Sequence, residues 1–463
     1  MKRALLLLAL AADAAGHGRD PYIVHIEARP RHEQDLLAGA SIGLLVSHDG
    51  GATWRWTCEE AVHYRDPFDP DYAYSAAGSV LAQTQVGLGV DRSGCRFDAT
   101  MLGTTTVSNV AAATDGALYV SAAGSMDAAI YKSIDDGVTF TKIATPGQNG
   151  DWWSSLEVAR SDPQRIYLSG YRFVAGNTKQ LLLFVSRDGG ATFSTMSTSA
   201  FVTTNSSAIL IAGIGENPDV VYAHVTLTTD AGGDAIYRSL DAGTTWTQIF
   251  SSNDVYGLAF LARRSGELVA GTRSSGAWRS SDGVTWTLLA NAPHISTLAE
   301  TAAGEVWAGT QNYAWAGPMG LPPISSDGYA IMKSLDLATW TPVMRFQDLG
   351  PPACAADTDA YQQCVATSLG IGTPWCCLVG QLGITSMEVD CSGANSCGYD
   401  LTPDMTIDDP SRPPRGCCSA SGVDSCPLVL LVVLMLRRRS LRGASRATPR
   451  SCVGGSRSRS RST

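Results

Sequence analysis

Short apolar runs alternate along the chain with polar, glycine-containing turns, and this alternation predicts β-strands joined by tight hairpins. Six of the runs lead into the same polar pattern, in which Ser, Asp and Thr precede an aromatic residue, in most copies with Gly between them. The first copy, residues 47–54, reads SHDGGATW. The acidic residues of the six copies are Asp49, Asp135, Asp188, Asp241, Asp282 and Asp336. Because a second short strand begins at each aromatic residue, we expect each copy to form a turn between two antiparallel strands.

The spacing of the copies indicates how many units the chain contains. Successive acids are 41 to 54 residues apart, except for a first interval of 86 residues, which is about twice one unit. A degenerate copy at Val90–Phe97 occupies that gap, with Arg92 where the acid should stand. Counting it gives seven units at roughly the 40–50-residue period of a four-stranded propeller blade. The sequence therefore predicts an all-β fold, a seven-bladed β-propeller over residues 21–346.

The repeated pattern resembles the Asp-box (BNR) repeat of sialidases, sortilin-type domains, xyloglucan-degrading glucanases and propeller-type photosystem II assembly factors. The resemblance covers roughly residues 21–346. It implies that the six acids are structural turn residues on the face opposite the ligand. A repeat of this kind indicates a fold and leaves the function open, because many functions share one fold.

The first 15 residues have the features of an export signal. Lys2 and Arg3 precede an apolar stretch from Ala4 to Ala12, and small residues flank Asp13 at a candidate cleavage site. The stretch is too short to span a bilayer. We therefore expect residues 1–15 to be removed and the protein to be exported, either secreted or held at the cell surface.

Twelve cysteines in an exported protein predict disulfides. Cys58 follows the first copy of the pattern and Cys95 lies inside the degenerate copy, so adjacent blades would bring the two together, and we predict a Cys58–Cys95 bridge. Six more cysteines fall between residues 354 and 397. We expect residues 350–402 to form a Cys-rich disulfide module, whose six cysteines allow fifteen pairings.

The C-terminal part divides into a Pro-rich linker (403–416), a segment with an apolar run and an Arg cluster (417–439), and a Ser/Arg-rich tail (440–463). Its order resembles a myxobacterial C-terminal sorting tag (MYXO-CTERM), with Gly416 and Cys417 matching the processed Gly-Cys pair. The resemblance implies attachment to the membrane or cell surface. The apolar run, Leu428–Leu436, is shorter than the ~20 residues of a spanning helix. A buried segment of the Cys-rich module is the alternative, and the tail is either a disordered end or a product of a shifted reading frame.

Charge excludes one class of partner. The formal net charge is −9, yet residues 437–463 hold nine Arg and no acid. Removing these nine from the 34 basic residues leaves 25 against 43 acidic residues. Such an acidic body argues against nucleic-acid binding, which needs a basic face. No cofactor motif or metal-ligand spacing is present, so we expect no cofactor and no metal.

Aromatic and polar residues gather in the segments that precede inner strands, where a propeller presents its ligand loops. These candidates for the ligand face are Trp152, Trp153, Asp254, Tyr256, His294 and Trp315. Exposed Trp and Tyr stack on sugar rings or anchor protein partners. The alternative for Trp152 and Trp153 is packing between blades, and for His294 the pattern favours a hydrogen-bonded loop residue over a base.

These observations favour a monomeric, exported propeller that binds an extracellular protein or glycan without catalysis. The alternative is a glycoside hydrolase with paired carboxylates near the pore, although no pair can be placed from the sequence. A sialidase is excluded, because the early Phe/Tyr-Arg-Ile-Pro motif of that family is absent. An assembly factor is a third possibility, but those relatives use an Arg-rich patch and this body is acidic.

Overall fold

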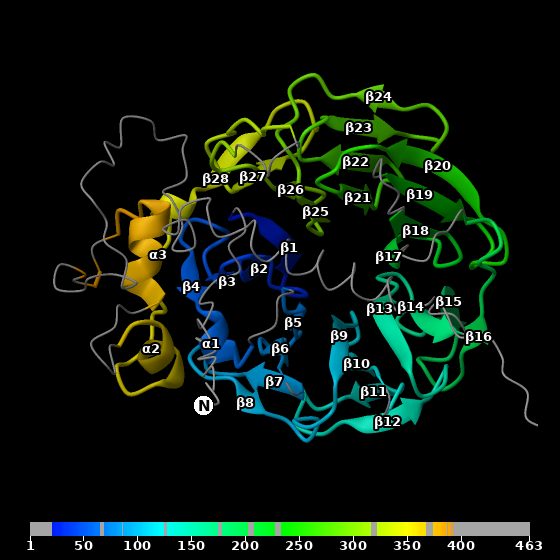
Figure 1. Ribbon diagram of the computed structural model, residues 1–463, viewed down its shortest axis with the longest axis horizontal. Helices are drawn as coiled ribbons and strands as arrows, with labels where there is room; N and C mark the ends of the chain where they lie inside the picture. Colours follow the sequence, from blue (N-terminus) through cyan, green and yellow to red (C-terminus); the bar gives the residue numbers. More distant parts are fainter. Residues whose placement is uncertain are drawn as a thin grey trace, which may run out of the picture. The chain divides into compact units, whose positions relative to one another are not determined.

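Seven four-stranded antiparallel sheets follow one another along the chain and are arranged as blades around a common axis (Figure 1). Within each blade the strands pair in sequence order, from an innermost to an outermost strand. Each innermost strand contacts the innermost strand of the next blade, and β1 contacts β25, so the ring is complete. The predicted seven-bladed β-propeller is confirmed, and the second unit is a full blade.

The strands are short, as the apolar runs of the sequence predict. Blades 1 to 3 consist of β1 (Ile23–Ala28), β2 (Leu36–Ala40), β3 (Gly43–Ser47), β4 (Arg55–Thr57); β5 (Tyr72–Tyr74), β6 (Val80–Thr84), β7 (Gly87–Asp91), β8 (Asp98–Ala99); and β9 (Val107–Ala112), β10 (Leu118–Ala122), β11 (Ile130–Ser133), β12 (Thr141–Ala144). Blades 4 and 5 consist of β13 (Asp151–Val158), β14 (Ile166–Val174), β15 (Thr178–Ser186), β16 (Ser194–Thr195); and β17 (Ala208–Ile214), β18 (Val221–Thr226), β19 (Asp234–Ser239), β20 (Thr247–Ser252). Blades 6 and 7 consist of β21 (Leu258–Ala262), β22 (Leu268–Thr272), β23 (Ala277–Ser280), β24 (Thr287–Leu288); and β25 (Thr297–Glu300), β26 (Val306–Gly309), β27 (Ile331–Ser334), β28 (Thr341–Met344).

This computed structural model describes residues 21–391, apart from 65–68, 86, 125–126, 175–177, 202–207, 227–232, 316–321, 367–373, 387 and 390. The predicted signal peptide, the linker, the sorting segment with Gly416 and Cys417, and the tail lie outside the described residues.

The repeated pattern forms the turn between the third and fourth strands of a blade, which we call the corner. In blade 5, Asp241 accepts hydrogen bonds from the amide of Thr245 at 2.8 Å and from its hydroxyl at 2.7 Å. Ser239 donates its hydroxyl to Asp241 at 2.8 Å and accepts the amide of Gly243 at 2.8 Å. The corners of Asp49, Asp135 and Asp188 repeat these four bonds. The shorter corners of Asp282 and Asp336 keep the Ser–Asp bond and the Asp-to-amide bonds. The acids of all six corners therefore hold turns.

The degenerate corner of blade 2 is held by Asp91 and not by Arg92, the residue at the aligned acid position. Asp91, one residue before Arg92, accepts the amides of Ser93 at 2.8 Å and Gly94 at 2.7 Å. Arg92 instead donates to the backbone carbonyl of Asp136 in the corner of blade 3, at 2.8 Å. Asp91 thus takes the place of the corner serine, since Ser280 accepts the amides of Asp282 and Gly283 in the same way.

The aromatic residue that closes each corner turns inward. Trp54, Phe140 and Trp246 are buried, and the other three closing rings are partly buried. The corner of blade 1 packs tightly against its neighbour, since a Cβ on Gly51 would lie 2.7 Å from the ring of Trp307 in blade 7. Gly51 has a φ of +88°, which favours glycine at this position as well. Each corner therefore contributes to the packing between blades.

The ring is closed without exchange of strands, because every blade comes from one continuous segment. The Ser296 hydroxyl of blade 7 donates to the Ile23 carbonyl of blade 1 at 2.6 Å. Beyond blade 7, the chain crosses to the outer edge of blade 1. There the Gly350 amide donates to the Trp54 carbonyl at 3.0 Å, and the Gly350 carbonyl accepts the Trp56 amide at 2.9 Å.

Residues 346–391 continue from this contact and form what we call the clasp. It contains a short 3₁₀ helix (Phe346–Asp348), α2 (Asp359–Cys364) and α3 (Pro374–Leu382), and it lies beside α1 (Glu59–Val62) and β4 (Figure 1). Trp375 is fully buried, with its ring 5.8 Å from that of Trp56. The clasp therefore shares one hydrophobic core with blades 1 and 7.

The disulfides join the clasp to the propeller. Cys58 pairs with Cys364, Cys95 pairs with Cys354, and Cys376 pairs with Cys391. The predicted Cys58–Cys95 bridge is therefore wrong. Cys58 follows the outermost strand of blade 1, whereas Cys95 lies in the corner of blade 2, at the opposite end of the antiparallel sheets. Proximity of two blades does not bring opposite ends of their sheets together.

The corner geometry predicts the effect of removing one hydroxyl. Ser239 is 1% exposed, and Ser239→Ala would leave the buried Gly243 amide without its acceptor. We expect the free energy of unfolding to fall by about 1–3 kcal/mol in urea denaturation. The matched control is Ser281→Ala, at an exposed position of the next corner, where a change below about 0.5 kcal/mol is expected. Equal losses in the two variants would contradict this role of the hydroxyl.

The disulfide pattern can be checked directly. Digestion of the unreduced protein should release one peptide pair that joins Cys58 to Cys364 and another that joins Cys95 to Cys354, both identified by mass spectrometry. Replacing Cys58 and Cys364 together by Ser should lower stability by about 2–4 kcal/mol. A Cys58–Cys95 peptide pair would contradict the structure.

Candidate functional site

The two faces of the propeller differ in what they carry. Because adjacent strands of a blade run in opposite directions, the corners lie at one end of the sheet. The connections to the next blade and the turns between second and third strands lie at the other end. We call these two ends the corner face and the loop face. All six residues predicted to bind a ligand belong to strands or connections at the loop face.

Three aromatic side chains on the loop face surround one arginine. The guanidinium carbon of Arg273 lies 4.5 Å from the ring centre of Tyr22, 5.6 Å from that of Trp315 and 6.0 Å from that of Tyr256. The rings of Tyr256 and Trp315 are themselves 5.2 Å apart. These four residues, which we call the aromatic cluster, come from blades 1, 6 and 7. Sequence reasoning found Tyr256 and Trp315 but missed Tyr22 and Arg273.

Hydrogen bonds to neighbouring residues hold the members of the aromatic cluster in place. Arg273 is only 7% exposed and donates to the Gln311 side chain at 2.6 Å. Trp315 forms a two-residue antiparallel bridge with Ile324, with both hydrogen bonds at 2.8 Å. The Tyr256 hydroxyl donates to the carbonyl of Pro322. All three rings remain partly exposed, so the cluster offers aromatic surface in a fixed arrangement.

Asp254 positions this cluster and is not itself presented to solvent. It is 5% exposed and accepts the amide of Tyr256 at 2.9 Å and the hydroxyl of Ser274 at 2.6 Å. Burial raises the pKa of Asp254, but these hydrogen bonds outweigh it and hold the pKa below its usual value. The carboxylate thus fixes the loop that carries Tyr256.

His294 is also held by a carboxylate. Its Nδ1 lies 2.8 Å from Asp327 Oδ1, and its backbone amide donates to Asp327 Oδ2 at 3.0 Å. The pair joins the β24–β25 and β26–β27 connections of blade 7, beside the aromatic cluster. Asp327 therefore fixes the orientation of the His294 ring, which remains partly exposed.

The tryptophan pair of blade 4 lies elsewhere. Trp152 and Trp153 were expected in a loop, but both belong to β13, so they point to opposite sides of the sheet. Trp153 is 4% exposed and packs edge-on against Phe184, with ring centres 5.9 Å apart, so it is a packing residue. Trp152 is 40% exposed and stays a candidate for contact with a ligand.

The innermost strands carry a second group of ionisable residues, which sequence reasoning did not identify. His25 and Glu27 lie on β1, Asp71 precedes β5, and Glu157 lies on β13. Electrostatic interactions couple these four groups, although Glu157 comes from blade 4 and the others from blades 1 and 2. All four lie on or just before the innermost strands of their blades. These residues could have been identified in the sequence from ionisable residues at alternate positions of an inner strand, as in the His25-Ile26-Glu27 segment.

Two of these carboxylates have structural partners. Glu27 accepts the amide of Tyr74 at 3.1 Å, and Asp71 accepts the amide of Val110 at 2.9 Å. In each case the amide belongs to the innermost strand of the next blade, whose inner edge pairs with no other strand. Side-chain oxygens therefore substitute for a missing strand partner.

Glu157 differs, because no hydrogen bond between described residues involves its carboxyl group. Glu157 is an exposed residue, yet the protein around its carboxyl group partly desolvates that group and raises the pKa of Glu157 to about 8, with a further contribution from Asp71. Desolvation likewise raises the pKa of Asp71 to about 6. Burial lowers the pKa of His25, but the Glu27 hydrogen bond and the nearby carboxylates outweigh it and leave that pKa raised.

Arginine side chains cross the ring at the corner face. Arg31 of blade 1 donates to the Thr114 carbonyl of blade 3 at 3.0 Å, and Arg160 of blade 4 donates to the Ala262 carbonyl of blade 6 at 3.3 Å. Each bond skips one blade. These contacts join non-adjacent blades at the corner face.

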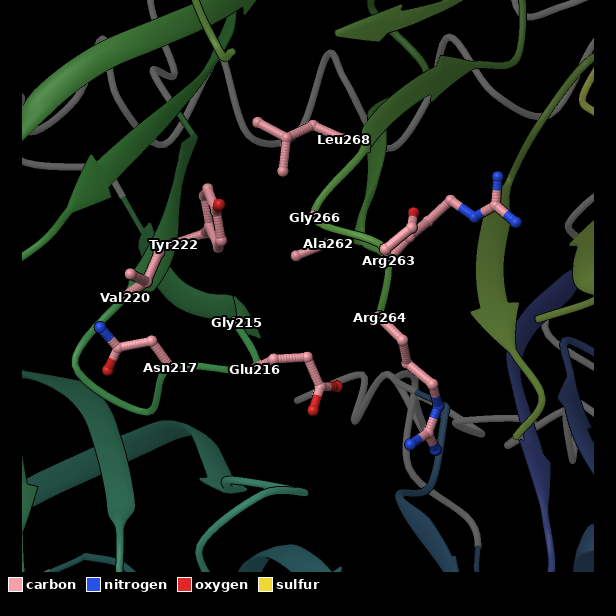
Figure 2. A pocket seen from close by; sticks show the side chains of 11 residues that line it. Gly215, Glu216, Asn217, Val220, Tyr222, Ala262, Arg263, Arg264, Gly266 and Leu268 are labelled. Carbon is pink, nitrogen blue, oxygen red and sulfur yellow. The ribbon is translucent and has the colours of Figure 1, made fainter. Parts of the chain in front are cut away.

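A shallow cavity of about 310 Å³ lies on the same face, between blades 5 and 6 (Figure 2). Tyr222 and Leu268 line it, while Glu216 and Arg264 lie on the two turns that flank it. None of the predicted ligand residues borders this cavity.

Among the described residues, no group of His, Cys, Asp and Glu is arranged to hold a metal ion. In the same part of the chain, no helix is long and apolar enough to cross a membrane.

Comparison with known proteins gives partial matches. No model of a known protein family matches the chain. A xyloglucanase of Hypocrea jecorina is 27% identical over 241 residues, which is 50% of this chain and 26% of the relative, so the chain spans about a quarter of that protein. An ancestral GH74 enzyme matches with a TM-score of 0.45 and 12% identity, over 71% of this chain and 49% of that one. YCF48 from Cyanidioschyzon merolae matches with a TM-score of 0.43 and 13% identity, over 63% and 96%.

The raised pKa of Glu157 predicts a pH dependence of stability. The native state keeps a proton that the unfolded state releases above about pH 4.3, so stability should fall as pH rises from there to about 8. Glu157→Gln removes this loss, and the variant should gain stability relative to the wild type across that window. Urea denaturation at pH 5 and pH 8 measures the difference. Glu60→Gln, in α1, is the control, and an equal pH response in both variants would contradict the assignment.

Proposed function

We propose that this protein is an exported propeller that binds a glycan through the aromatic cluster on its loop face. The observation that supports this most directly is the set of three partly exposed rings, Tyr22, Tyr256 and Trp315, grouped around Arg273. Aromatic rings bury a large apolar area against a ligand, and Tyr and Trp add a polar group at the edge.

The rigid support of the cluster favours binding. Arg273, Asp254 and the Trp315–Ile324 bridge fix the rings before any ligand arrives. A preorganised surface loses little conformational entropy on association, which increases affinity without additional contacts. The partial similarity to a xyloglucanase supports a carbohydrate over a protein as the ligand.

The disulfides support export. Three bridges between described residues are expected to persist only in an oxidising compartment. Together with the predicted signal peptide and the Gly416-Cys417 segment, they favour a protein that leaves the cytoplasm and is held at the cell surface.

A glycoside hydrolase is the second candidate, and one observation favours it. Such enzymes need a carboxylic acid that keeps its proton at neutral pH, together with a second carboxylate. Glu157, with a pKa raised to about 8, has the first property, and Asp71 is a carboxyl group coupled to it. Release of reducing sugar distinguishes this candidate from simple binding.

The test is a glycan array with the full-length protein, followed by calorimetry on the best ligand. We expect binding, and we expect Trp315→Ala and Tyr256→Ala each to weaken it by about 1–3 kcal/mol, as hot-spot aromatic residues do. Release of reducing sugar that is lost in Glu157→Gln would favour the hydrolase.

Phe173→Ala is the matched control, because Phe173 is a 48% exposed aromatic side chain at the far side of the loop face, in blade 4. Its loss should leave affinity unchanged. Absence of glycan binding, or an equal loss in all three variants, would refute the proposal and would favour a protein partner.

A further inference from the structure

The two loop-face connections of blade 7 bring a serine, a histidine and an aspartate into sequential contact. Ser325 Oγ lies 3.2 Å from His294 Nε2, and His294 Nδ1 lies 2.8 Å from Asp327 Oδ1. A hydroxyl, an imidazole and a carboxylate joined in this order are the arrangement that activates a serine as a nucleophile.

The aspartate is positioned to orient the imidazole. Asp327 Oδ2 accepts two backbone amides, from His294 at 3.0 Å and from Gln311 at 2.9 Å, while Oδ1 faces the ring. An ionised carboxylate only accepts hydrogen bonds, so the proton of the neutral imidazole lies on Nδ1. Nε2 then has a free lone pair, which accepts the hydrogen bond from Ser325.

The serine is accessible to a ligand. Ser325 is exposed, whereas the side chain of Asp327 is only 12% exposed. The residue before the serine, Ile324, is the bridge partner of Trp315, so the nucleophile lies next to the aromatic cluster. Catalytic groups held on loops above a rigid scaffold commonly have this placement.

Donors for a developing oxyanion are also present. Among the hydrogen bonds between described residues, none uses the backbone amides of Ser325 and Ser326 as donors. The amide that follows a nucleophilic serine is a recurrent oxyanion donor in serine hydrolases.

We propose that Ser325, His294 and Asp327 form a catalytic triad that hydrolyses carboxylic esters. This activity does not depend on the proposed glycan binding, although an O-acyl group on a bound glycan would lie close to Ser325.

The reaction proceeds in two steps, the acylation and then the deacylation of Ser325. Ser325 Oγ adds to the acyl carbon while its proton passes to His294 Nε2, and the ester C–O bond then breaks as the alcohol leaves with that proton. Water adds to the acyl-serine in the same way, again giving its proton to His294. The products are the free acid and Ser325 with its proton restored, and no redox partner is needed.

The experiment uses the full-length protein, a fluorophosphonate probe and 4-nitrophenyl acetate. The probe should label Ser325, as mapped by peptide mass spectrometry, and hydrolysis should show a burst of one 4-nitrophenolate per protein. His294→Ala should lower the rate of labelling by on the order of 10²–10⁴-fold, the usual contribution of a general base. Asp327→Asn should lower it as well, with the far-ultraviolet circular dichroism unchanged.

Ser325→Ala should abolish labelling, and Ser281→Ala, at an exposed serine of the corner face, should leave it unchanged. A folded protein that the probe does not label at Ser325, or equal rates in the wild type and Ser325→Ala, would overturn the triad. Glycan binding that persists in Ser325→Ala would show that the proposed triad and the proposed glycan binding can be tested independently.

Discussion

The buried serine hydroxyl that holds six of the seven corners is the interaction on which the rest of the propeller depends. In blade 5, the Ser239 hydroxyl accepts the Gly243 amide and donates to Asp241, and the acid in turn holds the amide and hydroxyl of Thr245. These bonds fix the reversal from the third to the fourth strand. With every reversal satisfied internally, the opposite ends of the blades are free to vary, and all the candidate ligand residues lie there.

This arrangement explains why the fold was predictable and several details were not. The corners repeat with a regular period, so local residues alone indicate seven blades. Asp91 lies where the other corners have their serine, and its carboxylate accepts the amides two and three residues on, as the Ser280 hydroxyl does in blade 6. The sequence suggested a loop at Trp153 because the apolar run of this strand starts only after that residue. The strand itself, β13, already begins at Asp151, and the Trp153 ring is buried.

Contacts between segments that lie far apart in the chain could not be predicted from the residues around them. Cys58 and Cys364 are 306 residues apart, and their pairing depends on where the chain goes after the last blade. His294, Ser325 and Asp327 come from two different connections of blade 7 and match no contiguous motif. Tyr22 joins Trp315 only because the first and last blades meet, and Arg273 reaches both rings from blade 6. In each case the three-dimensional ring, and not the neighbouring sequence, brings the residues together.

The clasp has a consequence for biosynthesis. The cysteines near the first two blades, Cys58 and Cys95, wait for partners that emerge from the ribosome more than 250 residues later. Until Cys354 and Cys364 have been translated, both thiols are obliged to stay reduced or to form temporary, incorrect pairs. Correct oxidation is therefore a late event in maturation, because it requires the chain to have been translated at least as far as Cys364.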